Sequence, residues 1–480
     1  MGGAKFEAVG RKATGRVLSA VMFFPRGGSA HAARGLAREL PRRGWRVTLL
    51  SGSRPGAGPD ADARVFYRGL DVRPVEPEDI AAGDGARFGS RGSAARTQLS
   101  YEDRPGASEA VFAGLDDLDF ERHVRAWSAA LERAGVGRAD IAHLHHLTPI
   151  NEAIGRLAPD LPVIGQLHGT ELLMLERIEA GPPASWRHAE RWRERLVDWA
   201  HRCRRLLVAP GGLDRAARLL ELDPSRLVPM PNGLDPELFK PHRVDRAAHW
   251  RRHLVAEPLG WAPGRPPGSV SYTDAELDAL RSGVVLVYAG RFTEVKRVPL
   301  LIEAFAKAQP GFRRPAALVL AGGYPGEWEG EHPARTIART GVRGVFLAGW
   351  HDQSVLPSFL AAADAFVFPS VREQFGQALI EAMACGLPTV AADSFGARAI
   401  VADGETGWIV PGDDRDALAR ALVEVVNDDA ERARRARSAE AAARRYSWPL
   451  VAERVADVFE REARPAGERP ADLRHAAAEA

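Results

Sequence analysis

The sequence predicts an α/β protein made of two doubly wound domains, each built on a parallel sheet. The chain has 480 residues, which is too long for one ordinary hydrophobic core and favours two or three domains. Short apolar strands alternate with helical patterns in both halves, as in sheets with right-handed helical crossovers. Two such sheets facing each other would enclose a central cleft, because doubly wound sheets bind ligands at the carboxyl ends of their strands.

The first half opens with a strand–helix–strand unit. The apolar run VLSAVMFF is followed by an amphipathic pattern that ends at Gly44 and by the strand WRVTLLSG. Residues 52–108 are rich in Gly, Pro, Asp and Arg, so we expect loops with short strands there. Further strands are predicted at 140–147, 162–169, 205–210 and 226–235, with helices near 119–134, 150–158, 185–205 and 212–222.

The second half follows a segment whose Pro- and Gly-rich part predicts an irregular insertion or linker. Its apolar strands are nearly continuous, which indicates burial on both faces. They are VVLVYAG, AALVLAGG, GVFLAGW, AFVFPS, PTVAAD and GWIVP. We therefore expect an N-terminal Rossmann-like domain at 1–240, the insertion at 241–282, a C-terminal Rossmann-like domain at 283–455, and a closing helix and tail at 456–480.

Composition excludes several classes of protein. The formal net charge of +2 gives no global attraction to nucleic acid. The only cysteines are Cys203 and Cys385, so we expect a reducing, cytoplasmic setting rather than a disulfide-stapled one. No run reaches the ~18 apolar residues of a membrane span. The Trp- and Arg-rich helix at 185–205 has two interpretations: a solvated face over buried tryptophans, which we favour, or a peripheral contact with a membrane surface.

A pair of cations follows the first strand of the second domain. In YAGRFTEVKR, Gly290 allows the backbone to turn, and Arg291 and Lys296 lie in the loop that opens the next helix. Cations at the carboxyl end of a strand, beside a helix N-terminus, favour an anion site. Arginine replaces lysine nearly everywhere else in this chain, which draws attention to Lys296. The alternative is a pair of solvated surface cations.

Two glutamates lie in VREQFGQALIEAMACGLP. Glu373 precedes a predicted helix, Phe375–Gly376 lies at its N-terminus, and Gln377 begins it. Glu381 lies inside this helix among small apolar residues. Carboxylates accept hydrogen bonds only, so the two suit the hydroxyl pairs of a sugar and a ribose. The alternative for Glu381 is a glutamate on the helix surface.

Histidines give weaker signals. His168, in QLHGTE, ends a strand of the first domain and would face the cleft, although a structural role is equally open. His143 and His145 share a strand face, but no third ligand indicates a zinc site. Gly28, in PRGGSAH, precedes a helix without forming a G-x-G-x-x-G fingerprint. The acidic stretch DDLD at 116–119 resembles a metal-binding pair but more simply caps a helix.

Together these motifs resemble the retaining glycosyltransferases of the GT-B fold, and among them family 4. The second half carries GR with a later lysine at 290–296, AGG at 321–323, E-x7-E at 373–381 and GETGWIVPGD at 404–413. The first half adds GGSAH, HGTE and PNGLDPELF. The resemblance covers roughly 17–460. Gln374, where the family often has proline, and the insertion at 241–282 depart from the pattern.

The resemblance implies a role for each site residue of the second domain. Arg291 and Lys296, after Gly290, would hold the diphosphate of a nucleotide sugar. Glu381 would bind the ribose hydroxyls, and Glu373 the donor sugar.

Further roles also come from the resemblance alone. The backbone around Phe375, Gly376 and Gln377 would contact sugar and phosphate. His168 would lie by the donor sugar and Gly28 near the phosphates or acceptor. Gly322 and Gly323 would lie near the base, and the helix at 446–462 would cross back to the first domain.

The implied reaction is metal-independent, front-face hexosyl transfer from a UDP-, GDP- or ADP-sugar, with no cofactor. The acceptor stays open between a small alcohol or thiol metabolite, such as a natural product, and a lipid or polysaccharide. Two other functions fit the same fold: a non-catalytic nucleotide-sugar-binding protein, and a phosphorylase or epimerase.

Overall fold

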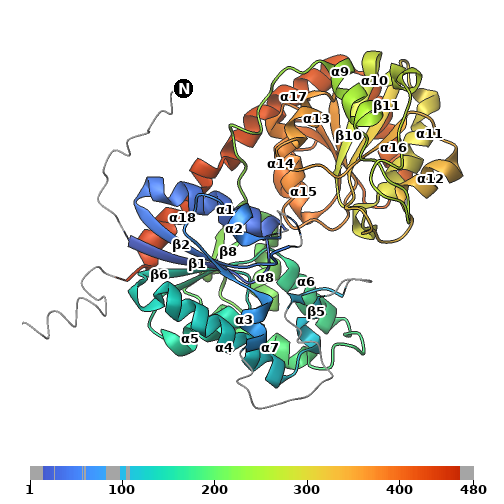
Figure 1. Ribbon diagram of the computed structural model, residues 1–480. Helices are drawn as coiled ribbons and strands as arrows, with labels where there is room; N and C mark the ends of the chain where they lie inside the picture. Colours follow the sequence, from blue (N-terminus) through green and yellow to red (C-terminus); the bar gives the residue numbers. More distant parts are fainter. Residues whose placement is uncertain are drawn as a thin grey trace, which may run out of the picture. The chain divides into compact units, whose positions relative to one another are not determined.

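The computed structural model describes residues 15–25, 27–56, 58, 61–82, 98–103 and 109–464. The chain divides into two compact units (Figure 1). The first takes the residues up to Gly233 together with those from Trp448 onward, and the second is Leu234–Ser447. Parts of the predicted 52–108 loops and the tail beyond 464 lie outside the described residues.

The first unit contains a seven-stranded sheet in the order β3-β2-β1-β6-β7-β8-β9, in which every described pair is parallel. Its strands are β1 Gly15–Val21, β2 Trp45–Gly52, β3 Val72–Val75, β6 Ile141–His145, β7 Val163–Gln166, β8 Arg205–Val208 and β9 Leu227–Pro229. A separate pair is formed by β4 Leu99–Ser100 and β5 Ala110–Val111. Strands therefore do occur within 52–108, as expected.

Helices cover both faces of this sheet (Figure 1). They are α1 Gly28–Glu39, α2 Ala63–Phe66, α3 Pro77–Ala82, α4 Asp117–Ala134, α5 Pro149–Leu157, α6 Thr170–Glu179, α7 Ala189–Arg202, α8 Leu213–Leu219 and α18 Trp448–Glu462. Helix α1 packs against α18, and α4 against α5. The two faces of the sheet pack into separate hydrophobic cores. Val17 belongs to the core beside α1 and α18, whereas the next residue, Leu18, belongs to the core beside α4 and α5.

The closing helix α18 spans Trp448–Glu462, within the helix expected at 446–462, and it belongs to the first unit. The domain boundary expected at 456 therefore falls inside this helix. The Trp448 ring packs closely over Gly35 and Gly233: a Cβ atom added at these glycines would lie 2.2 and 2.4 Å from the ring. Further along, Phe459 meets Trp45 edge to face at 5.5 Å.

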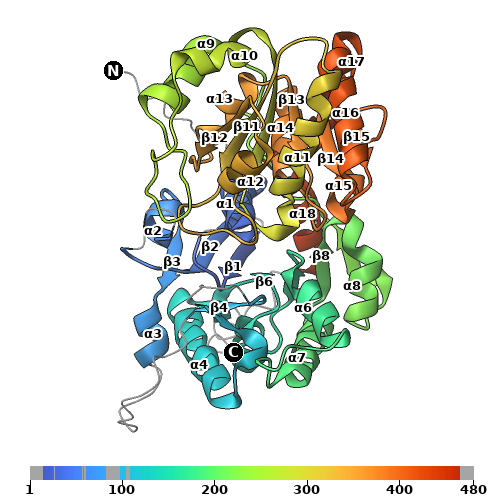
Figure 2. The same cartoon turned by 90° about the vertical axis from the view of Figure 1, so that its right-hand side faces the viewer.

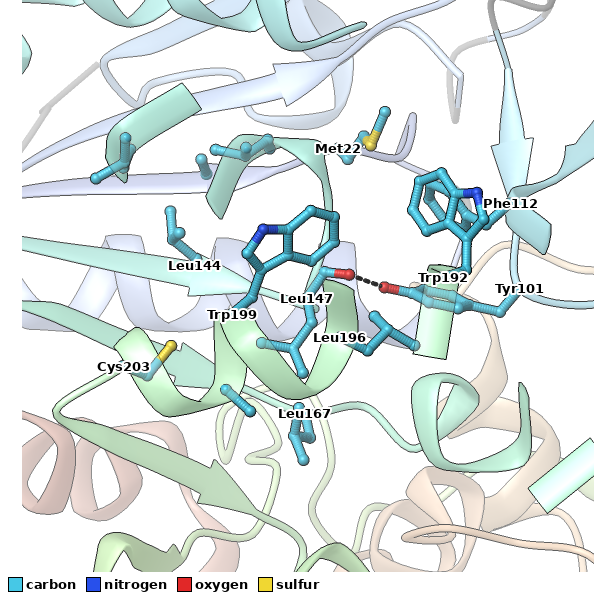
Figure 3. Close-up of a cluster of buried hydrophobic side chains, with 14 of the residues drawn as sticks. Met22, Tyr101, Phe112, Leu144, Leu147, Leu167, Trp192, Leu196, Trp199 and Cys203 are labelled. Atoms are coloured by element: carbon cyan, nitrogen blue, oxygen red, sulfur yellow. Dashed lines mark hydrogen bonds between the residues drawn. The ribbon is translucent and has the colours of Figure 1, made fainter. Parts of the chain in front are cut away.

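The basic helix α7 buries its tryptophans. Trp192 and Trp199 are fully buried within the core shown in Figure 3, and their indole groups donate hydrogen bonds to Leu115 O and Glu152 Oε2. The favoured interpretation of this helix, a polar face over buried tryptophans, is therefore confirmed. Figure 3 also shows Tyr101 donating to Leu147 O in the same core.

The second unit contains a six-stranded parallel sheet in the order β12-β11-β10-β13-β14-β15. In Figure 2 this order runs from β12 at the left of the unit to β15 at the right. The strands are β10 Val284–Gly290, β11 Ala316–Gly322, β12 Val345–Gly349, β13 Ala365–Phe368, β14 Thr389–Ala392 and β15 Gly407–Val410. Each coincides with one of the predicted apolar runs, because burial on both faces leaves a continuous apolar signal.

The helices of the second unit connect these strands. They are α9 Arg246–Arg251, α10 Asp278–Ser282, α11 Val298–Ala308, α12 Pro333–Thr340, α13 Leu356–Ala361, α14 Gln377–Ala384, α15 Phe395–Ile400, α16 Arg415–Asn427 and α17 Asp429–Ala443. Helix α11 packs against α16, and α14 against α17.

Residues 241–282 differ from the irregular linker that we expected. They lie within the second unit and contain α9, a π-helical turn at Arg252–Ala256 and α10. The Asp245 side chain caps α9 by accepting from Ala248 N. Trp250 and Leu254 are buried. Apart from Pro241, the Pro and Gly residues of this segment lie between 258 and 268. A prediction from the composition of the whole segment therefore missed the helices on either side.

No described helix combines the length and the apolar character needed to cross a membrane.

Candidate functional site

The loops after β10 and β13 bring Lys296 and Glu373 together. Lys296 ends a 3-10 turn at Glu294–Lys296, and its Nζ lies 2.5 Å from Glu373 Oε2. Both side chains are largely buried, at 14% and 18% exposure. Lys296 Nζ also lies 4.6 Å from the centroid of the Phe368 ring, a favourable cation–π contact. The sequence identified both residues, but it did not predict this ion pair.

The two loops are also joined through the backbone. Val371 N donates to Val295 O at 3.0 Å; Val295 directly precedes Lys296, and Val371 lies two residues before Glu373. Strands β10 and β13 are neighbours in the sheet, so their following loops lie at one edge. The pair is therefore held by the sheet rather than by the chance approach of two long side chains.

Arg291 lies in the same β10 loop and is exposed. Its carbonyl oxygen accepts a hydrogen bond from Tyr288 Oη at 2.7 Å. The hydroxyl leaves little room beside Gly290, since a Cβ atom there would lie 2.7 Å from Tyr288 Oη. Gly290 thus allows the strand to end against a buried tyrosine, with the arginine side chain directed away from the core.

Helix α14 begins where the sequence predicted it. Gly376 is its N-cap, in the left-handed region at φ 93°, which glycine adopts without strain. Phe375 is buried and meets Tyr446 at 5.8 Å. Gln377 is the first helical residue, and no side chain caps the helix N-terminus. The first backbone N–H groups of such a terminus are donors for an anion.

Glu381 lies within α14 and is buried, at 4% exposure. It is not the surface glutamate of the alternative interpretation. Its Oε1 accepts from Gln353 Nε2 at 2.8 Å and from Gln377 Nε2 at 3.2 Å. Burial raises the pKa of Glu381 to about 7, and the two amide donors act in the opposite direction. A carboxyl group buried under two neutral amides is unusual for a purely structural site.

The glycines Gly322 and Gly323 form a tight turn after β11. Their φ angles are 132° and 69°, and Gly323 N donates to Gly290 O at 3.1 Å. A Cβ atom on Gly322 would lie 2.0 Å from Gly290 O. Only glycine permits the ends of β10 and β11 to approach this closely.

Four residues of the second unit escaped the sequence analysis. Gln353 contacts Glu381, Trp261 contacts Gly323, and the exposed rings of Tyr324 and Trp350 meet edge to face at 5.7 Å. The last two follow neighbouring strands, β11 and β12. Strand-end position was the available signal, but aromatic residues outside charged motifs gave no chemical reason to single them out.

In the first unit, His168 follows β7 and joins a histidine cluster. Its Nε2 lies 3.0 Å from His145 Nδ1 at the end of neighbouring β6. His146 Nδ1 lies 2.6 Å from Glu171 Oε1. Burial, together with the neighbouring histidines, holds the pKa of His145 and of His168 well below the usual range. Within the described ranges no group of three or more His, Cys, Asp or Glu side chains could hold a metal ion.

Gly28 is the first residue of α1, which follows β1. A pocket lies at the carboxyl ends of β1, β2 and β3. It is lined by Met22, Phe23, Phe24, Gly52, Ser53, Arg54, Val75, Pro77, Ile80, Gln98, Leu99 and Trp127. Gly28 and His168 thus belong to the first unit, and the other sequence-predicted site residues to the second.

Two family models match the chain. The one described as Glycosyltransferase Family 4 matches residues 26–238, and the one described as Glycosyl transferases group 1 matches residues 277–444. The D-inositol 3-phosphate glycosyltransferase of Jonesia denitrificans is 30% identical over 291 residues, which are 58% of this chain and 69% of the relative. The phosphatidyl-myo-inositol mannosyltransferase of Mycobacterium leprae is 32% identical over 182 residues, 38% of this chain and 47% of that protein.

Solved structures match almost the whole chain. Sucrose-phosphate synthase from Thermosynechococcus elongatus has a TM-score of 0.65 at 18% identity, covering 94% of this chain and 99% of that one. Anabaena HepE, solved in complex with UDP and glucose, has a TM-score of 0.63 at 17% identity, covering 93% and 99%. At these identities the likeness concerns the fold alone.

Proposed function

The chain belongs to the glycosyltransferase family that these matches define, and from that premise we propose that it transfers a hexosyl group from a nucleoside-diphosphate sugar to an acceptor with retention of configuration. It is a transferase of the GT-B fold, with two Rossmann-like units. The observation that carries the donor assignment is the Lys296–Glu373 pair beside the uncapped N-terminus of α14.

The diphosphate would be held by cations and by backbone donors. Lys296 carries three ammonium protons, so it can keep Glu373 and still donate to a phosphate oxygen. Arg291 would add a second cation from the same loop, and the N–H groups after Gly376 would donate from α14. These groups face the charge that develops as the diphosphate leaves, where fixed donors are most effective. With this charge compensation, the proposed reaction needs no metal ion.

The two glutamates would hold the sugar and the ribose. Glu373 uses Oε2 for Lys296, which leaves Oε1 to accept from hydroxyl groups of the donor sugar. Glu381 would accept from the ribose hydroxyls in place of the amides of Gln353 and Gln377. The base would lie beyond the ribose, toward the turn at Gly322–Gly323 and the exposed rings of Tyr324 and Trp350.

The proposed chemical step proceeds on one face of the sugar. The bond between the anomeric carbon and the phosphate oxygen breaks while the acceptor oxygen bonds to the same face. The acceptor proton passes to the departing phosphate oxygen, so no protein base is consumed. His168, largely neutral because of its lowered pKa, would hydrogen-bond to the donor sugar rather than carry charge.

Two observations favour a donor and an acceptor class. Structures of Anabaena HepE contain UDP or UDP-glucose, which favours a UDP-sugar as the first donor to examine. Curated relatives are named for D-inositol 3-phosphate, which favours a small polar alcohol as acceptor. A lipid acceptor is the second candidate, favoured by the relative named for phosphatidyl-myo-inositol.

The experiment is a donor panel with matched lysine variants. UDP-, GDP- and ADP-sugars are incubated with alcohol acceptors, and both the released nucleoside diphosphate and the anomeric configuration of the product are measured. We expect transfer with retention and a loss of about 100- to 1000-fold in kcat for Lys296→Ala. Lys307→Ala is the control, because Lys307 pairs with Asp416 on the surface. Donor binding without product from any acceptor would favour the non-catalytic alternative.

A further inference from the structure

The middle of the 241–282 segment, Glu257–Tyr272, runs along the edge strand β12. Gly260 pairs with Val270, and Leu347 N in β12 donates to Tyr272 Oη at 2.7 Å. A Cβ atom on Gly349 would lie 2.0 Å from Leu259 O. We call Glu257–Tyr272 the edge brace. It covers backbone groups of an edge strand, which native sheets commonly protect.

The edge brace places one indole against the turn after β11. Trp261 is 1% exposed, and its Nε1 donates to Gly323 O at 2.9 Å. The ring lies 4.5 Å from His332 and 6.3 Å from Phe292, measured between centroids. Gly323 is therefore held at both backbone polar groups: its N–H donates to Gly290 O, and its carbonyl accepts from Trp261.

This turn needs external support. Two consecutive glycines restrict the backbone less than any other pair and lose the most conformational freedom on ordering. Tyr324 follows immediately and is 42% exposed, and it meets Trp350, 37% exposed, from the next strand end. Gln353, in the same β12 loop as Trp350, contacts Glu381. The turn thus continues the proposed donor site beyond the ribose position.

We propose that Trp261 is a positioning residue for nucleotide recognition: it fixes the Gly322–Gly323 turn so that Tyr324 and Trp350 present an ordered aromatic face to the base. The inference rests on the proposed function and assigns a role to the edge brace. Trp261 itself does not contact the donor. Substituting Trp261 removes the indole donor of the Gly323 carbonyl. The turn must then become ordered when the nucleotide binds, which lowers the affinity for the nucleotide.

The test compares Trp261→Phe with Trp250→Phe. Trp250 is a matched control, since it is buried in the same segment and its Nε1 has no hydrogen-bond partner among the described residues. The probes are UDP-glucose, GDP-mannose, ADP-glucose and inorganic pyrophosphate, with dissociation constants measured by calorimetry. For the tightest nucleotide sugar we expect Trp261→Phe to weaken binding by about three- to tenfold, with Trp250→Phe unchanged.

The affinity for pyrophosphate distinguishes a loss of base positioning from general damage to the donor site. Pyrophosphate can occupy the diphosphate position but not the base position, so its affinity should survive Trp261→Phe and fall in Lys296→Ala. Equal weakening of both probes by Trp261→Phe, or equal weakening by the two tryptophan variants, would overturn the inference. If the wild-type protein binds none of the nucleotide sugars, the proposed function itself fails, and this inference with it.

A second variant covers failure of Trp261→Phe to fold. Tyr272→Phe removes the acceptor of Leu347 N at the other end of the edge brace while leaving the Trp261 core contacts intact. We expect a smaller loss of nucleotide-sugar affinity with pyrophosphate binding retained. Unchanged nucleotide-sugar affinity in Tyr272→Phe, with Trp261→Phe unfolded, would count against the brace.

Discussion

Lys296 Nζ lies 2.5 Å from Glu373 Oε2, and the two residues follow neighbouring parallel strands of one sheet. The distance joins residues 77 positions apart in sequence. The pair places a cation and an acceptor at one sheet edge before any ligand is present. If the proposed donor binds here, these two groups are already in place and need no further ordering.

Glu373→Gln should separate catalysis from stability. We expect kcat to fall by about 100-fold or more, because a carboxylate that orients the sugar beside the leaving group is lost. The free energy of unfolding should fall by roughly 1–3 kcal/mol, because Lys296 loses its charged partner in a largely buried pair. Glu303→Gln, which breaks a surface pair with Arg339, is the control for both measurements. A kcat within about twofold of wild type would remove Glu373 from the site.

Nucleotide-sugar affinity should depend on the ionisation of Glu381. Burial raises its pKa from 4.5 to about 7, so the neutral form predominates below that pH and the carboxylate above it. Because the carboxylate is the better acceptor for ribose hydroxyls, the affinity for UDP-glucose should rise as pH rises toward 7 and level off above it. The limiting slope below the pKa is about tenfold per pH unit.

UDP-glucose suits this measurement because its substituted diphosphate does not titrate near neutral pH, whereas the terminal phosphate of UDP does. Glu381→Gln should bind weakly and without this pH dependence. If the variant shows the same slope as wild type, the titrating group is a different one.

The buried histidine cluster should make the protein sensitive to acid. Burial lowers the pKa of His143 from 6.5 to about 4, so the unfolded chain takes up a proton at pH values where the folded protein does not. Stability is therefore lost as pH falls from about 6.5 toward 4, and this one group accounts for roughly 2 kcal/mol at about pH 5.

Three proteins are compared: wild type, His143→Gln and His242→Gln. His242→Gln is the control, because His242 is exposed. The free energy of unfolding is measured by urea titration at about pH 7.5 and pH 5, and the His143→Gln protein should lose roughly 2 kcal/mol less than wild type between them. His242→Gln should behave as wild type. Equal losses in all three proteins would show that His143 is protonated in the folded state.

Trp192 should contribute to the stability of the first unit through core packing alone. It is fully buried and its Nε1 donates to Leu115 O. Trp192→Ala should therefore lower the free energy of unfolding by about 3–5 kcal/mol. Chemical denaturation of the purified variant checks this value. A loss below about 1 kcal/mol would mean that the indole is not packed as described.

The sequence predicted the second unit better than the contacts that complete its site. Its strands are buried on both faces, and such runs differ sharply from their polar connections. That Glu381 does not lie on the helix surface also followed from its apolar neighbours. The amide partners of Glu381 could not be predicted from the sequence, because Gln353 belongs to another loop and only the order of strands in the sheet brings it close to Glu381.

In the first unit, too, contacts between residues close in sequence could be predicted, whereas contacts between distant residues could not. Asp116 caps α4 as expected, accepting from Asp119 N, since a cap depends on residues three positions apart. The contact of His145 with His168 depends instead on β6 lying beside β7. Trp261 was missed for the same reason: its role depends on Gly323, far along the chain.

The most direct test of the donor site is a structure of the protein with UDP-glucose bound. The proposed function predicts Lys296 Nζ and the first N–H groups of α14 within hydrogen-bonding distance of the diphosphate. It also predicts Glu381 on the ribose hydroxyls and Glu373 on the sugar. A nucleotide sugar bound away from these residues, with Glu381 still capped by Gln353 and Gln377, would contradict it.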